Sequence, residues 1–258
     1  MRFLTVGGVT LHHAVRPGRE EMAPVVFLNS LGTDGRIWDG VVERLPEGTP
    51  TLVMDHRGHG LSELGPVTIE ALATDMAGLM DALGLRSAVV CGVSVGGMAA
   101  QALAAARPDL ARAALLICTG HRIGDVASWD ARIAAVREGG VAAVADAVLA
   151  RWFGPGFAED HPDLLAGCRA MLERTPPEGY AATCAAIRDA DLTATARGLR
   201  LPVLCLAGEH DGATPPALVE ELAALIPSAC LRVLPGAGHL PPLERPEAVA
   251  EAIIELAG

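Results

Sequence analysis

Short apolar runs rich in Val and Leu alternate with longer Ala- and Leu-rich stretches along most of the chain. Apolar runs of about four to eight residues predict buried strands, whereas apolar positions three and four apart predict helices. Their alternation predicts an α/β fold with a mostly parallel sheet flanked by helices on both faces. The predicted strands are Val25–Leu28, Thr51–Asp55, Ala88–Cys91, Ala113–Cys118, Pro202–Ala207 and Cys230–Leu234, and the predicted helices are Ile69–Leu83, Val95–Ala106, Ala217–Ile226 and Pro246–Leu256.

The N-terminal residues show a different pattern. Apolar and polar positions alternate on both sides of Gly7 and Gly8, which predicts two short strands joined by a turn. These two strands complete an expected eight-stranded sheet. The same segment lacks the long apolar region and the small-residue cleavage site of a signal peptide, so we expect a cytoplasmic protein.

The alternation stops between His121 and Gly198, where only helical patterns appear. We predict that residues 121–198 form a helical cap, and that residues 1–120 and 199–258 form the core domain. An insertion there would lie over the carboxyl ends of the strands, where open α/β sheets bind their ligands. The cap should therefore shape the substrate pocket.

Composition excludes several classes of function. The net charge of −11 argues against a nucleic-acid partner, which requires clustered positive charge. All 20 basic residues are Arg, and the absence of lysine excludes a Schiff-base lysine, a pyridoxal phosphate anchor and a Walker A motif. No segment approaches the roughly 20 apolar residues of a membrane span. The six cysteines contain no C-x-x-C pair and indicate neither disulfides nor a metal site, and we expect no cofactor.

Ser94 stands in the glycine-rich segment Gly92–Gly97, between the strand that ends at Cys91 and the helix that begins at Val95. A strand, a tight turn and a helix in this order are the context of a nucleophile elbow, in which the serine hydroxyl is presented above the sheet. The structural alternative is a glycine-rich turn with a serine that caps the helix. The motif alone therefore does not decide the function.

A serine nucleophile requires a histidine base, and a carboxylate must orient that histidine. His239 lies in a loop between the last predicted strand and the last helix, and Asp211 follows the strand Pro202–Ala207. The chain order serine, acid, histidine suits the elbow. Glu209 is a rival acid in the same loop, and spacing alone does not separate it from Asp211. The structural alternatives are an ordinary loop histidine and a turn aspartate.

Acyl transfer also requires donors for the oxyanion, normally the N–H after the nucleophile and another from the loop after an early strand. Val95 follows Ser94 and supplies the first. Leu31, after the strand Val25–Leu28, is the best-placed second donor. Its neighbour Ser30 is a candidate for substrate binding.

The segment Asp55–Gly60 places an aspartate, two histidines and an arginine within six positions. Metal binding is one interpretation. The glycines favour a tight turn, however, and an Asp–Arg pair commonly braces such a loop with two parallel hydrogen bonds. We expect a structural role.

Together these segments resemble the α/β-hydrolase superfamily and, more narrowly, the 3-oxoadipate enol-lactonases. The core segments that carry the resemblance are Asn29–Asp34 with Trp38, Asp55–Gly60, the elbow at Ser94, and Gly208–Pro216 with Asp211 as the acid. The cap segments are Trp129–Arg132, Arg151–Phe153 and Gly179–Asp189. The chain departs from the pattern at Val93 and Val95, where Leu and Met are usual, and at Leu240–Leu243.

The resemblance implies an enzyme that opens a lactone ring through an acyl-enzyme, with a small ester or lactone as its partner and no metal. The implied substrate carries a carboxylate, which the net negative charge would repel at long range, so a local cation is needed. Arg132, Arg151 and Arg188 in the predicted cap are candidates, because a guanidinium binds a carboxylate with two hydrogen bonds. For each arginine taken alone, the favoured alternative is a surface or helix-bracing role. Trp152 is a candidate roof of the pocket or part of the cap core.

Other functions remain open at this stage. A carboxylesterase, a perhydrolase or a carbon–carbon bond hydrolase would use the same triad. Haloalkane dehalogenases and epoxide hydrolases fit less well, because they carry aspartate where this chain has Ser94. A non-catalytic ligand receptor on the same fold would need no reactive serine. The sequence also leaves the oligomeric state open.

Overall fold

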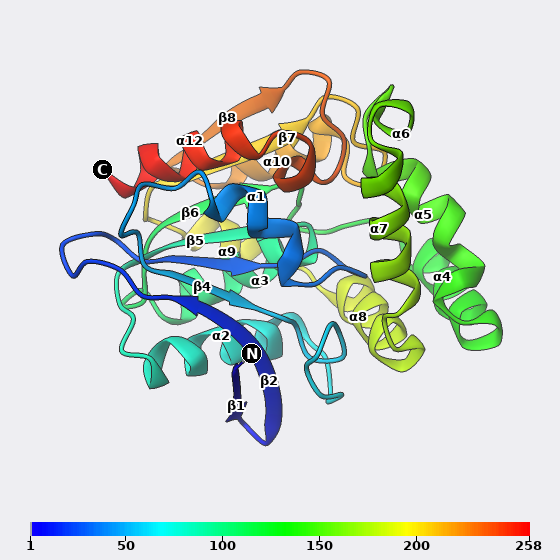
Figure 1. The fold of residues 1–258 in the computed structure, drawn as a ribbon, viewed down its shortest axis with the longest axis horizontal. Helices are drawn as coiled ribbons and strands as arrows, with labels where there is room; N and C mark the ends of the chain where they lie inside the picture. Colours follow the sequence, from blue (N-terminus) through cyan, green and yellow to red (C-terminus); the bar gives the residue numbers. More distant parts are fainter. Residues whose placement is uncertain (1) are drawn as a thin grey trace.

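The computed structural model describes residues 2–258 and contains one eight-stranded sheet of order β1-β2-β4-β3-β5-β6-β7-β8 (Figure 1). β2 pairs antiparallel with β1 and with β4, whereas the other neighbouring strands pair in parallel. The predicted eight-stranded, mostly parallel sheet is therefore confirmed. The strands are β1 (Arg2–Val6), β2 (Val9–Arg16), β3 (Val25–Leu28), β4 (Thr51–Met54), β5 (Ala88–Val93), β6 (Ala111–Ile117), β7 (Val203–Gly208) and β8 (Ala229–Leu234).

The central strands are the most apolar and the most buried. Every residue of β3, β5 and β7 is buried, whereas the edge strands β1 and β8 expose part of their length. The strand ends differ slightly from those predicted. β6 stops before Cys118, because the φ of 46° at that residue leaves the extended region of the backbone. β5 continues to Val93 and leads directly into Ser94.

Helices cover both faces of the sheet (Figure 1). α1 packs with α12, and α2 packs with α3, which also contacts β5 and β6. Local sequence explains the helix starts: Thr68 accepts a hydrogen bond from the Ala71 N–H, and Pro216 and Pro246 stand in first turns. These elements are η1 (Gly35–Trp38), α1 (Asp39–Val42), α2 (Ile69–Ala82), α3 (Val95–Ala106), α10 (Pro216–Leu225), α11 (Pro241–Glu244) and α12 (Pro246–Ala257).

The segment between β6 and β7 is entirely helical, and α4 to α8 gather at one end of the sheet (Figure 1, right). We propose α4 to α8 as the cap. The last helix of predicted cap residues 121–198, α9, packs instead against α3 and α10 of the core. Across residues 2–258, no helix has the length and apolarity to cross a membrane. The elements are α4 (Val126–Gly139), η2 (Val141–Val144), α5 (Ala145–Trp152), α6 (Phe157–Asp160), α7 (Pro162–Glu173), α8 (Pro177–Asp189) and α9 (Thr193–Gly198).

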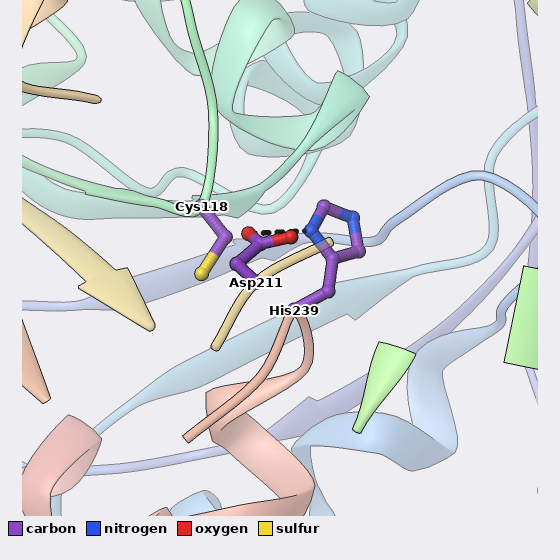
Figure 2. A group of neighbouring side chains, drawn as sticks. All are labelled: Cys118, Asp211 and His239. Atoms are coloured by element: carbon purple, nitrogen blue, oxygen red, sulfur yellow. Dashed lines mark hydrogen bonds and ion pairs between the residues drawn. The ribbon is translucent and has the colours of Figure 1, made fainter. Parts of the chain in front are cut away.

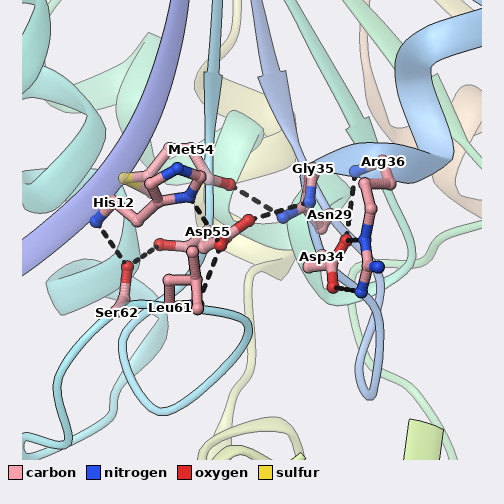
Figure 3. A network of polar contacts seen from close by, with 9 residues as sticks. All are labelled: His12, Asn29, Asp34, Gly35, Arg36, Met54, Asp55, Leu61 and Ser62. Atoms are coloured by element: carbon pink, nitrogen blue, oxygen red, sulfur yellow. Dashed lines mark hydrogen bonds and ion pairs between the residues drawn. The ribbon is translucent and has the colours of Figure 1, made fainter. Parts of the chain in front are cut away.

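The loop after β4 contains the predicted brace, with a different partner. Arg57 binds the carboxylate of Asp75 on α2 through two hydrogen bonds of 2.7 Å, and both side chains are buried. Asp55 instead accepts hydrogen bonds from the Gly35 and Leu61 N–H groups and contacts the His12 ring (Figure 3). The arginine brace thus ties the loop to a helix, and Asp55 ties it to the neighbouring loop and to β2.

The same loop touches the proposed cap. The backbones of Gly58 and of Gly179 in α8 are in close contact. A Cβ added to Gly179 would lie 2.2 Å from the Gly58 carbonyl oxygen. A side chain at either position would push the two segments apart. Glycine at both positions therefore allows the braced loop to set the position of α8.

The buried histidines of this loop should destabilise the protein in mild acid. Both ring nitrogens of His56 and the Nε2 of His59 lack a hydrogen-bond partner within residues 2–258. Burial lowers the pKa of His56 to about 3 and that of His59 to about 4. In the unfolded chain both should titrate near 6.5, so below that pH the unfolded state binds protons that the folded state excludes.

The stability contributed by the neutral histidines is present above about pH 6.5 and is lost as the pH falls toward the folded pKa values. We expect the free energy of unfolding to fall by about 3–4 kcal/mol between pH 7 and pH 5 from this pair. Urea unfolding at several pH values measures it. His56→Leu should remove about half of the pair's contribution, and an unchanged pH slope in that variant would contradict the prediction.

Candidate active site

Ser94 occupies a strained turn between β5 and α3. Its backbone has φ 58° and ψ −120°, an unusual conformation for a residue other than glycine. The turn is tight enough that a Cβ at Gly96 would lie 2.2 Å from the Leu28 carbonyl oxygen. The Ser94 N–H donates to Ile117 and its carbonyl accepts from the Thr119 hydroxyl, so the turn is held from β6 and the residues after it. The strand, turn and helix expected around Ser94 are all present.

Asp211 and His239 lie side by side at the ends of two loops (Figure 2). The His239 Nδ1 and the Asp211 Oδ2 are 2.9 Å apart, and both side chains are almost fully buried. Asp211 also accepts hydrogen bonds from the Ala213 N–H and from the N–H and hydroxyl of Thr214. Glu209 is exposed and accepts from the Gly236 N–H instead. The structure thus pairs Asp211, not Glu209, with the histidine.

The surroundings keep Asp211 ionised. Burial alone would raise the pKa of Asp211, but the charge of His239 and the hydrogen bonds from His239 and Thr214 outweigh it and hold the pKa below its usual value. A buried carboxylate stabilises a positive imidazolium and fixes the ring by its bond to Nδ1, which leaves Nε2 for a substrate or a nucleophile.

The loop that carries His239 is anchored to the proposed cap. The His239 N–H donates to the Trp152 carbonyl at 2.7 Å, at the end of α5. Glu244 of α11 accepts hydrogen bonds from the N–H groups of Gly154 and Gly238, at 2.7 and 2.8 Å. This carboxylate joins the residue before the histidine to the residue that follows Phe153. Glu244 was not predicted from the sequence, because its role depends on the meeting of two backbone segments that are far apart in the chain.

Cys118 lies behind the acid (Figure 2). Ligand atoms of Cys118, Asp211 and His239 lie within 4.8 Å of one another, the one group in residues 2–258 with the composition of a metal site. Burial, and next the charge of Asp211, raise the pKa of the Cys118 thiol well above its usual value. The thiol therefore stays protonated, and Asp211 and His239 already bind each other. The arrangement suits proton transfer better than metal binding.

Two backbone donors lie near Ser94. The Val95 N–H heads α3, and the Leu31 N–H belongs to the loop after β3. Neither N–H has an acceptor within residues 2–258. The Leu31 loop is held by buried side chains, since Asn29 donates to the Met54 carbonyl and accepts from the Trp38 ring (Figure 3 shows Asn29 and Met54). The two predicted oxyanion donors are thus unpaired within residues 2–258, and Leu31 lines the same cavity as Ser94.

A cavity of about 250 Å³ brings most of the predicted site residues together. Ser94 and His239 both line it, and so do Leu31 and Ser30 of the first loop and Trp152 of α5. Trp152 is almost fully buried, so it belongs to the packing of the cap as well as to the cavity wall. A larger cavity of about 490 Å³ lies between α7 and the Asp55 loop and includes none of these residues.

The three predicted arginines separate into two groups. Arg132 and Arg151 line the cavity with Ser94, and neither forms an ion pair within residues 2–258. Arg188 lies outside this cavity and binds Asp130 and Asp189. The structure therefore does not bring Arg188 to the site, because its charge is already neutralised at the surface.

Further residues of the cavity wall escaped the sequence analysis. Tyr180 and Thr214 are fully buried polar residues of this wall, and Ser128, Trp129 and Ile187 come from α4 and α8. Arg132 lies over the Trp129 ring, 4.9 Å from its centroid. The motifs Trp129–Arg132 and Gly179–Asp189 were noted as cap segments, but which of their side chains turn inward depends on the packing of α4 on α8.

The chain matches the Alpha/beta hydrolase family over residues 25–252. It belongs to that family. A 3-oxoadipate enol-lactonase 2 of Acinetobacter baylyi is 34% identical to this hydrolase over 252 residues, which are 97% of this chain and 94% of that protein.

Solved structures agree. The enol-lactonase from Burkholderia xenovorans superposes with a TM-score of 0.94 at 39% identity, covering 99% of both chains. A thermophilic esterase from Thermogutta terrifontis superposes with a TM-score of 0.92 at 30% identity over 100% of both chains. The resemblance stated from the motifs and the α/β-hydrolase fold are both confirmed. The chain is an enol-lactonase-like hydrolase, and relatives of this kind act on small lactones and esters.

Proposed function

We propose that this hydrolase opens the lactone ring of 3-oxoadipate enol-lactone, a reaction of aromatic catabolism, through an acyl-enzyme on Ser94. The observation that carries the proposal is one cavity that contains Ser94 on its strained turn, His239 bonded to a buried Asp211, and two unpaired arginines. Enol-lactonases among the similar proteins support it. A general carboxylesterase is the alternative, supported by the esterase from Thermogutta terrifontis.

In the proposed reaction, the Ser94 Oγ attacks the lactone carbonyl while the His239 Nε2 accepts its proton. The negative oxygen of the tetrahedral intermediate is bound by the N–H groups of Leu31 and Val95. The ring C–O bond then breaks, the acyl group stays on Ser94, and the enol oxygen leaves with a proton from His239. Asp211 keeps the imidazole oriented throughout.

An enol is a better leaving group than an alcohol, so acylation should be the easier half of the reaction. Water then attacks the acyl-enzyme, with His239 as its base, and releases Ser94. The freed enol converts to the ketone in solution. The protein therefore has to provide one nucleophile, one base and one oxyanion site, and it needs no metal for either half of the reaction.

The substrate's carboxylate needs a local cation in a protein of net charge −11. Arg132 is half-buried, unpaired within residues 2–258 and part of the cavity wall, whereas Arg151 is exposed at the rim. A partly desolvated guanidinium binds a carboxylate more strongly than an exposed one. We therefore assign the carboxylate to Arg132 first and to Arg151 second.

Arg132→Met should raise KM for the enol-lactone by about 10- to 100-fold and leave kcat closer to normal, because the carboxylate is remote from the reacting carbonyl. Steady-state kinetics measure this. Arg188→Met is the matched control, since Arg188 on α8 also belongs to the helical region between β6 and β7 but lies outside the cavity. Equal KM values in the wild type and in Arg132→Met would remove Arg132 from the proposed site.

The decisive test of the substrate compares kcat/KM for 3-oxoadipate enol-lactone and for p-nitrophenyl acetate in the same preparation. An enol-lactonase should prefer the lactone by several orders of magnitude, because specific contacts to the remote carboxylate contribute to the transition state. Similar values for both substrates would favour the carboxylesterase. No turnover of either substrate would favour a non-catalytic ligand receptor.

A further inference from the structure

Tyr180 is a buried polar residue that the proposed reaction does not use. It stands in the first turn of α8, its side chain is fully buried, and it lines the same cavity as Ser94 and His239. No acceptor within residues 2–258 takes the proton of its hydroxyl, and the Arg132 guanidinium lies close enough to donate to the hydroxyl oxygen. Most buried hydroxyls are hydrogen-bonded, and an unpaired one destabilises the fold. A hydroxyl proton without an acceptor, on a residue of the cavity wall, is therefore a candidate donor to a bound ligand.

Tyr180 is held both at its backbone and at its ring. Its neighbour Gly179 meets the backbone of Gly58 in the braced loop. Gly32, next to the oxyanion donor Leu31, faces the ring so closely that an added Cβ would lie 3.0 Å from the Tyr180 Cε2. The hydroxyl thus has a defined position relative to the proposed oxyanion site.

The surroundings favour a neutral donor. Burial, and next Cys184, raise the pKa of Tyr180 well above its usual value, against the opposing effect of nearby Arg132. The hydroxyl stays protonated at all working pH values and does not serve as a base. The nearby Arg132 guanidinium forms no ion pair within residues 2–258, so a neutral donor and a cation lie together in the cavity wall. This combination fits an anion with two oxygens.

We propose that Tyr180 donates a hydrogen bond to the substrate's carboxylate, beside Arg132, and thereby selects carboxylate-bearing lactones over neutral ones. This specificity role rests on the proposed function. Arg132 attracts the carboxylate through its charge, which acts over a distance. The Tyr180 hydroxyl orients the carboxylate through a directional hydrogen bond. A hydrogen bond to a charged acceptor is stronger than one between neutral groups. Loss of the hydroxyl should therefore lower kcat/KM mainly for the anionic substrate.

The test compares Tyr180→Phe with the wild type on two substrates that differ in one group: the enol-lactone and its methyl ester, in which the carboxylate is masked. For the free acid, kcat/KM should fall by about 10- to 100-fold, mainly through KM. For the methyl ester it should change by no more than about twofold. The variant should fold normally, since it loses only an unpaired hydroxyl.

A tyrosine with a purely structural role would change both substrates equally or neither, and either result would overturn the proposal. The thermal midpoint of Tyr180→Phe, equal to or above that of the wild type, shows that any loss is not a folding defect.

A binding measurement separates this inference from the proposed function. Tyr180 is the chain's single tyrosine, so ¹³C-tyrosine labelling gives one set of ring signals. Adipate, a dicarboxylate without a reactive bond, should shift the signal of the ring carbon that bears the hydroxyl, and Tyr180→Phe should bind adipate about tenfold more weakly. No shift and equal binding would sink the Tyr180 role, whereas binding without turnover of the lactone would sink only the proposed function.

Discussion

Replacing Ser94 with alanine should lower kcat for ester or lactone hydrolysis by about 10³-fold or more. The reason is chemical: without the hydroxyl no acyl-enzyme forms, and only the oxyanion donors and substrate binding remain to assist direct attack by water. KM should change little, because the hydroxyl occupies a small part of the cavity wall. The fold should survive, since no side-chain hydrogen bond of Ser94 caps α3.

Steady-state kinetics and labelling with a fluorophosphonate probe measure the effect together. The wild type should label and Ser94→Ala should not. Ser128→Ala is the matched control, because Ser128 also lines the cavity but its hydroxyl is bonded to Asp125 at 2.6 Å. A Ser94→Ala protein that keeps more than about a tenth of the wild-type kcat would exclude the acyl-enzyme mechanism. A wild type that fails to label would favour the ligand receptor.

The core was predictable because each of its elements is encoded locally. The buried central strands appear as continuous apolar runs. Ser94 follows β5 and Asp211 follows β7, whereas His239 follows the edge strand β8. Since parallel strands end at the same edge of the sheet, the topology gathers these loops without any further information. The Asp211–His239 hydrogen bond is the contact that such reasoning expects.

The cap contributions were less predictable, because they depend on how helices pack. Arg132 and Arg188 were equivalent in the sequence, yet α4 turns one toward the cavity and ion pairs hold the other at the surface. Tyr180 carries no motif of its own, and its importance follows only from its burial beside Gly32 and Arg132. Arg57 was expected to pair within its own loop, but it pairs with Asp75 on α2.

The residues that connect core and cap explain why the site has a fixed shape. Glu244 joins the histidine loop to the end of α5, and the Gly58–Gly179 contact joins the Asp55 loop to α8. One connection positions the proposed base, and the other positions Tyr180. Changes outside the cavity can therefore alter catalysis or specificity separately.

Asp75→Leu should destabilise the protein by about 3–5 kcal/mol, because it leaves the buried Arg57 guanidinium without its carboxylate. Arg57 cannot release its proton, and its remaining hydrogen bond in the structure is to the Pro66 carbonyl. Burial raises the pKa of Asp75, although Arg57 acts against this rise. When Arg57 is removed, Asp75 can take up a proton and become neutral. Arg57→Met should therefore cost less than Asp75→Leu.

Urea unfolding measures the difference, and the double variant Arg57→Met/Asp75→Leu should recover much of the lost stability, because no charge stays buried without a partner. Asp81→Asn, on the same helix but in an exposed ion pair, should change little. Equal losses of unfolding free energy in Asp75→Leu and Asp81→Asn would show that the buried ion pair contributes no more stability than the exposed one.

The double variant should also change substrate preference. Arg57 precedes Gly58, the residue that contacts Gly179 of α8, so without the brace α8 and the Tyr180 hydroxyl are less firmly positioned. KM for the carboxylate-bearing lactone should therefore rise more than KM for its methyl ester.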